Sequence, residues 1–302
     1  MKYISKLFIM LTFVFGLAFS STLFVQSAYA KDEGINELLG APIVVYGGNL
    51  TEDQKAEVRR ILDVDQDNVT EMEVTGKDIA HYIDGNPNSN MYSSVKITHK
   101  DKGHGIVVNI VTADNITQVT SEMYSNALLT AGVENALIEV ASPLQVTGHS
   151  ALTGIYKAYD AAGADLDKDR MEVANDELSI ATELSEKEGL TQETVTELMT
   201  EIKKAIADQD PATREDVEKI VQEQLDKLEI NLSEEDRQLL TDLFERMREL
   251  DIDFDKVKQQ LEDITSTIKD RLGDINIDEG FWDKVSKFFQ DLIDSIAGLF
   301  KG

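Results

Sequence analysis

The pattern of hydrophobic and polar positions changes near residue 160. Before it, short apolar runs alternate with segments of helical spacing. The apolar and alternating runs predict strands at residues 43–46, 69–74, 92–98, 106–112 and 137–141. The segments around them predict helices at residues 52–62, 77–83, 119–131 and 148–162.

Local signals set the ends of several of these elements. Thr51, with Gln54 three residues on, predicts a capping box, and Gly132 and Gly163 predict helix ends. We expect the first helix to bury Ala56, Val58, Ile61 and Leu62. Residues 100–103 predict a hairpin turn between the strands at 92–98 and 106–112. This mixture of strands, helices and a hairpin favours an α+β fold over a doubly wound parallel sheet.

From residue 170 onward the apolar spacing is helical throughout, and breaks fall at Gly189, Pro211, Gly273 and Gly280. The sequence thus predicts an N-terminal mixed strand and helix domain at residues 34–163 and an all-α acidic helical region at 170–302. An apolar stripe at residues 257–275 suits a coiled coil with another chain or packing within this chain, and its short length and polar flanks favour the second.

The last segment has the strongest amphipathic pattern, and its polar face mixes acids with lysines. Such a helix suits a membrane surface, a groove in a partner, or docking on the chain's own bundle. The balanced charge weakens the lipid interpretation. The candidate contact residues are Phe281, Trp282, Val285, Phe288, Phe289, Leu292, Ile293, Ile296, Leu299 and Phe300.

The first thirty residues have the order of a secretory signal peptide. Lys2 and Lys6 precede an apolar run at residues 7–24, and Ala28 and Ala30 stand at cleavage spacing before a charged start at Lys31. The run is long enough to remain as an uncleaved anchor, but the small residues and the polar turn favour cleavage. We therefore expect residues 1–30 to be removed and the protein to be secreted or extracellular, with retention at the cell envelope as an alternative.

Composition narrows the chemistry. The chain has 302 residues and a formal charge of −28. It has no cysteine, and this excludes disulfides, thiol nucleophiles and cysteine metal sites. The negative field repels phosphates, so nucleic acid is not an expected partner. No phosphate loop or dinucleotide fingerprint occurs, and we expect no cofactor.

Three stretches resemble a known family. They are GGNLTEDQ at residues 47–54, NITQVTSEMYSNALLTAG at 115–132 and GHSALTGIYKAY at 148–159. They are similar to the YpuA-like family, exported proteins of Gram-positive bacteria classed as domain of unknown function 1002. The resemblance implies export and a Gram-positive envelope setting, and it supplies no activity and no catalytic residues.

The remaining candidate chemistry is sparse. His99 and His104 flank the expected hairpin, where they suit a surface metal site with Asp101, although polar turn residues are the simpler interpretation. Ser150 follows His149 at a helix start but lacks the nucleophile-elbow motif, so capping by Thr147 or Ser150 is favoured over hydrolysis. Aspartates alternate at 63–67, 165–169 and 251–255 without the glycine of a calcium loop, which favours caps and linkers over a metal.

These patterns favour an exported, non-catalytic cell-envelope protein of unknown activity. We expect it to bind a membrane surface, the cell wall or an exported protein through its helical C-terminal part. The alternative is an extracellular hydrolase with a site in the N-terminal domain, around His149 and Ser150. The sequence indicates no ligand, substrate or oligomeric state.

Overall fold

The computed structural model describes residues 41–64, 68–187, 189–250 and 252. The expected signal peptide, the stripe at 257–275 and the candidate contact residues from Phe281 to Phe300 lie outside these residues.

Five strands form one mixed sheet with the order β2-β1-β3-β5-β4. β1 and β2 run parallel, as do β4 and β5, whereas β3 is antiparallel to both β1 and β5. This sheet and the helices that follow confirm the α+β prediction. The strands are β1 (Ile43–Gly47), β2 (Thr70–Val74), β3 (Ser94–His99), β4 (Ile106–Ile110) and β5 (Ala136–Ala141).

The expected hairpin between β3 and β4 is wrong, because β5 lies between them in the sheet. Asn135, which precedes β5, explains the difference. Its side-chain oxygen accepts hydrogen bonds from the backbone N–H groups of Gly103, at 2.9 Å, and Gly105, at 3.2 Å. Its carbonyl accepts from the N–H of Lys100 at 2.7 Å. The loop at residues 100–105 therefore wraps around the start of β5 instead of joining two paired strands.

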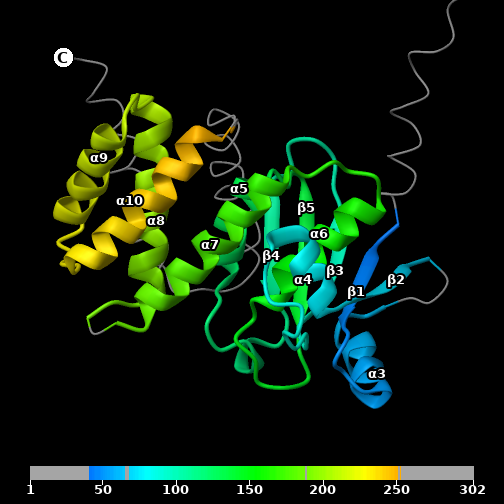
Figure 1. The fold of residues 1–302 in the computed structure, drawn as a ribbon. Coiled ribbons are helices and arrows are strands. Elements are labelled where there is room, and N and C mark those ends of the chain that lie inside the picture. Colours follow the sequence, from blue (N-terminus) through cyan, green and yellow to red (C-terminus); the bar gives the residue numbers. More distant parts are fainter. Residues whose placement is uncertain (1–40, 65–67, 188, 251, 253–302) are drawn as a thin grey trace, which may run out of the picture.

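Helices cover both faces of the sheet and continue into a bundle beside it (Figure 1). α5 and α6 pack on one face, and α3 covers the β1 and β2 end of the other. The α-helices are α3 (Glu52–Ile61), α4 (Gly76–Ile83), α5 (Ser121–Ala131), α6 (Ser150–Ala161), α7 (Lys168–Ser185), α8 (Gln192–Gln209), α9 (Arg214–Lys227) and α10 (Glu234–Glu249), and a short 3-10 helix, η1, spans Ala113–Asn115.

Alternation along the strands divides the core into two clusters. On β3, Val95 and Ile97 face the large cluster under α5 and α6. On β1, Val44 and Tyr46 face the small cluster under α3, where Val58 and Leu62 are buried. Ala56 is exposed, so its expected burial is wrong. The expected burial of Val58 and Leu62 is confirmed, and Ile61 is half-buried, so the buried side chains lie toward the C-terminal end of the helix.

The helical region follows its sequence pattern closely. The apolar stripes of α8, α9 and α10 are buried. The N-cap residues of these helices are Thr191, Thr213 and Ser233. The large apolar cluster extends without a break from the sheet to Ile252, and α7 packs against α5. The division into units at 34–163 and 170–302 stays a prediction.

Candidate functional site

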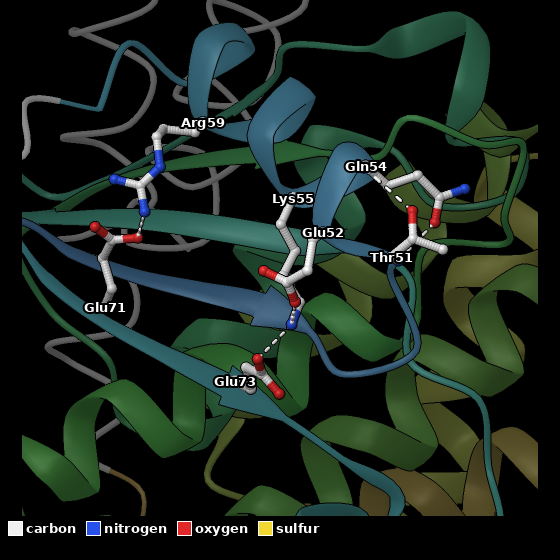
Figure 2. A network of polar contacts seen from close by, with 7 residues as sticks. All are labelled: Thr51, Glu52, Gln54, Lys55, Arg59, Glu71 and Glu73. Atoms are coloured by element: carbon white, nitrogen blue, oxygen red, sulfur yellow. Dashed lines mark hydrogen bonds and ion pairs between the residues drawn. The ribbon is translucent and has the colours of Figure 1, made fainter.

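An open groove of about 310 Å³ lies between α3 and the edge strand β2. We call it the α3–β2 groove. It is larger than the second cavity found in the described residues. Most of its lining residues are charged, and Figure 2 shows their side chains. The lining residues are Tyr46, Glu52, Lys55, Ala56, Arg59, Glu71, Met72 and Glu73.

Local structure explains why these charges meet. The capping box expected at Thr51 and Gln54 is confirmed, and it fixes the start of α3. Spacings of three and four residues then place Glu52, Lys55 and Arg59 on one helical face. In β2, the period of two places Glu71 and Glu73 on one face of the strand. The helix presents its bases to the acids of the strand.

The side chains form a ladder of ion pairs between the two elements (Figure 2). The ammonium of Lys55 contacts Glu73 at 2.5 Å and Glu52 at 3.0 Å, and the guanidinium of Arg59 pairs with Glu71. Hydrogen bonds to Glu73 and then to Glu52 raise the pKa of Lys55, so it is charged at neutral pH. Three carboxylates and two cations line the groove. The arrangement therefore has a net charge of −1.

Tyr46 supplies a buried hydroxyl that makes no hydrogen bond of normal length within the described residues. Its side chain is 4% exposed, and its hydroxyl is buried without a hydrogen-bond partner. Burial raises the pKa of Tyr46 well above its usual range, and the carboxylate of Glu71 adds to the shift, first by its contact with the hydroxyl and then by its charge. The guanidinium carbon of Arg59 lies 5.9 Å from the ring centroid. The residues that line this charged groove thus include a tyrosine with a buried, neutral hydroxyl.

His149 and Ser150 are not joined as a base and a nucleophile. The hydroxyl of Ser150 accepts a hydrogen bond from the N–H of Ser93 at 3.2 Å. The two ring nitrogens of His149 contact the hydroxyls of Thr147 and Thr182, at 3.2 Å and 3.1 Å. Burial lowers the pKa of His149, and Glu186 opposes this only in part. Each residue is therefore engaged in a separate structural contact.

The capping expected at this helix start is also wrong. The N-cap residue of α6 is His149, and no side-chain hydrogen bond caps the helix there. Ser150 already belongs to the helix. Its hydroxyl accepts a hydrogen bond from the backbone N–H of Ser93, just before β3, and does not cap the helix.

In the described residues, no group of three or more His, Asp and Glu side chains is arranged to hold a metal ion. His99 stands in register with Ala136 of β5, so it does not face the strand that follows His104. Asp167 caps α7 by accepting from the N–H of Arg170 at 2.9 Å, which confirms the cap interpretation for the middle aspartate triplet. The third triplet and part of the first lie outside the described residues.

Sequence reasoning placed its site residues, from Phe281 to Phe300, beyond the described residues and did not find the α3–β2 groove. Two signals for the groove were present. Bases recur beside Glu52 at helical spacing, and Glu71 and Glu73 alternate on a strand. Neither signal reveals that α3 lies over β2. Across the described ranges no helix has the length and apolar character needed to span a membrane.

Comparisons with known proteins agree on one family. The profile of the family described as "Protein of unknown function (DUF1002)" matches residues 46–264. The chain is 36% identical over 273 residues to "Uncharacterized protein YpuA" of Bacillus subtilis (strain 168), covering 87% of this chain and 91% of that protein. No solved structure gives a significant match. The resemblance drawn from the three sequence stretches is confirmed.

Proposed function

The chain belongs to the DUF1002 family of proteins of unknown function, and from its own residues we propose that it is an exported, non-catalytic protein of the cell envelope. In this proposal the C-terminal segment contacts a membrane surface, the wall or another exported protein. The family name supplies no activity, so support comes from three features of the chain itself.

The first feature is the N-terminal leader. Lys2 and Lys6, the apolar run at 7–24 and the small residues Ala28 and Ala30 have the order that export machinery and signal peptidase recognise. The absence of cysteine is compatible with an oxidising exterior, because the folded part is held by its apolar core and not by disulfides.

The second feature, which carries the non-catalytic part of the proposal, is the separation of His149 from Ser150. A serine nucleophile needs a base within hydrogen-bond reach, and here the imidazole contacts two threonines while the serine bonds to the N–H of Ser93. The hydrolase alternative therefore gains no support from this geometry.

The third feature is the distribution of exposed apolar side chains along the chain. In the described part of the chain, the exposed large hydrophobic side chains are Val111, at 43%, and Leu144, at 38%. They follow the neighbouring strands β4 and β5, and two residues are too few to form a binding patch. The sequence concentrates its aromatic side chains in the stripe from Phe281 to Phe300 instead, with a polar face beside it.

Cell fractionation tests the proposal. The full-length chain is expressed in a Gram-positive host, and the envelope and medium fractions are compared with those of a chain truncated after residue 280. We expect the mature product to begin at Lys31 by mass spectrometry, and we expect truncation to move the protein from the envelope to the medium. Phe288→Ser with Phe289→Ser should act like the truncation, because it removes apolar contact area.

Lys284→Ser with Lys287→Ser is the matched control, since it changes the polar face of the same segment and should leave the distribution unaltered. Vesicles, purified wall and a pull-down of exported proteins then distinguish the three contacts. A cytosolic product that keeps Met1 would remove the export proposal, and equal partitioning of full-length and truncated chains would remove the contact proposal.

A further inference from the structure

We propose that the outer edge of β2, away from β1, binds an extended basic segment of another protein as an added strand, with a lysine or arginine of that segment entering the α3–β2 groove. This surface is separate from the C-terminal segment, and the inference does not rest on the proposed envelope contact.

The backbone of β2 is arranged for strand addition. β2 is the end strand of the sheet, and within the described residues no strand pairs with its outer edge. The N–H of Thr70 donates to Pro42 and the carbonyl of Val74 accepts from Gly48, so these residues bond toward β1. In a parallel pair the bonding direction alternates, and Glu71 and Glu73 therefore turn their N–H and C=O groups outward. Both residues are exposed.

The charge of the groove specifies the kind of partner. Glu52, Glu71 and Glu73 outnumber Lys55 and Arg59 by one, and the side chain of Glu73 is 50% exposed. In an added strand, every second side chain lies on the same face as Glu71 and Glu73, within contact distance of them. A basic residue at such a position neutralises the groove. The chain's charge of −28 attracts a basic segment from a distance.

The hydroxyl of Tyr46 is the second, independent sign of a ligand. It is buried, has no hydrogen-bond partner and belongs to the lining of the groove. Tyr46 stands in register with Glu73, so the hydroxyl-bearing ring and that carboxylate lie in one row across the strands. An ammonium or guanidinium N–H that reaches this row donates to the tyrosine oxygen and pairs with the carboxylate. A buried polar group without a hydrogen-bond partner destabilises the protein, and a donor from the ligand would remove this penalty.

A second copy of this chain is a poor occupant of the same edge. Antiparallel pairing of two β2 strands about Met72 places Glu71 of one copy opposite Glu73 of the other. Like charges directly opposite each other destabilise a strand pair. The acids on β2 thus oppose self-association and favour a basic partner.

Peptide binding to the purified mature chain tests the inference. The probe is a short synthetic peptide of alternating lysine and valine, followed by calorimetry and by backbone amide shifts in NMR. We expect binding, with the largest shifts in β2 and α3. Glu71→Gln with Glu73→Gln should weaken it about tenfold, because two charge contacts are lost. Tyr46→Phe should weaken it several-fold without changing the fold, because the hydroxyl makes no internal hydrogen bond.

Two controls separate strand addition from general attraction. Glu215→Gln with Glu218→Gln, on the exposed face of α9, removes the same charge and should leave the affinity unchanged. The same peptide with N-methylated backbone amides keeps its lysines but loses the strand hydrogen bonds, and it should bind at least tenfold more weakly. Equal weakening by the two double variants, equal binding of the methylated peptide, or no binding of the lysine peptide would overturn the inference.

Discussion

At the scale of single residues, Asn135 connects the loop at residues 100–105 to the start of β5. It holds a φ of 47°, a conformation that asparagine tolerates better than most residues, and its side-chain oxygen gathers two glycine N–H groups. The loop at 100–105 and the start of β5 meet at this one amide. Its replacement should therefore affect stability more than its partly exposed position suggests.

We predict that Asn135→Ala lowers the free energy of unfolding by about 2–4 kcal/mol, from two lost hydrogen bonds and the cost of a left-handed alanine. Asn135→Gly should lose less, because glycine adopts this backbone without strain. Asn135→Asp is the matched control, because aspartate keeps a side-chain oxygen that accepts the two hydrogen bonds and also tolerates the left-handed backbone. Urea unfolding measures all three, and an alanine variant as stable as the aspartate variant would contradict the prediction.

Residue-scale predictions from sequence succeeded where the cause is local. The capping box at Thr51 and Gln54 and the end of α5 at Gly132 depend on neighbours within a few positions. The contacts of Asn135 and His149 reach about thirty residues along the chain. Sequence spacing carries no signal for such contacts.

At the scale of elements, Asp78 joins two helices. Its carboxylate accepts from the N–H of Thr75 at 2.7 Å, at the start of α4, and from Lys157 of α6 at 2.8 Å. Burial raises the pKa of Asp78, but the hydrogen bonds from Lys157 and Thr75 outweigh it and lower the pKa below its usual value. The folded protein thus holds this carboxylate charged to lower pH than the unfolded chain does.

The sign of this shift fixes a pH dependence. Since the folded pKa lies below the unfolded value of about 4, the unfolded chain binds the proton first as pH falls. The stabilisation from Asp78 is complete above pH 4 and is lost as pH falls through the lower folded pKa. We predict that Asp78→Asn is less stable than the wild type at pH 6 and that this difference shrinks toward pH 2. Urea unfolding across this range measures it, and a constant difference would contradict it.

Element positions could be predicted from sequence, but their partners could not. Each of the five expected strands exists within a few residues of its predicted range. The pairing of β3 with β5 depends on register across some forty residues, whereas the hairpin prediction used only the local turn signal at residues 100–103. The groove was missed for the same reason, because Arg59 and Glu71 meet only when α3 folds back over β2.

At the scale of the whole molecule, a buried ion pair joins the sheet layer to the helical bundle. Lys203 of α8 contacts Glu177 of α7 at 2.6 Å, with side-chain exposures of 1% and 2%. The ammonium also donates to the carbonyl of Asn126 in α5 at 2.7 Å, and Thr130 of α5 donates to Glu177 at 2.6 Å. Three helices therefore meet at one pair of charges, and burial lowers the pKa of Lys203.

We predict that Lys203→Met destabilises the fold by about 3–5 kcal/mol, because it leaves the Glu177 carboxylate buried without its cation. Adding Glu177→Leu should recover much of the loss, since an apolar pair removes both desolvation costs. A double-mutant cycle by urea unfolding measures the coupling. If the double variant is no more stable than Lys203→Met alone, the pair does not act as a unit.

The place of β5 also has a temporal consequence. β5 is last along the chain, yet it separates β3 from β4 in the sheet. During synthesis or export from the N-terminus, β1, β2 and β3 can pair as soon as they emerge. β4 has no strand to pair with until residues 136–141 have also emerged. Synthesis or threading that stalls before this point leaves an unfinished sheet with two open edges, and such an intermediate invites capture by chaperones or proteases.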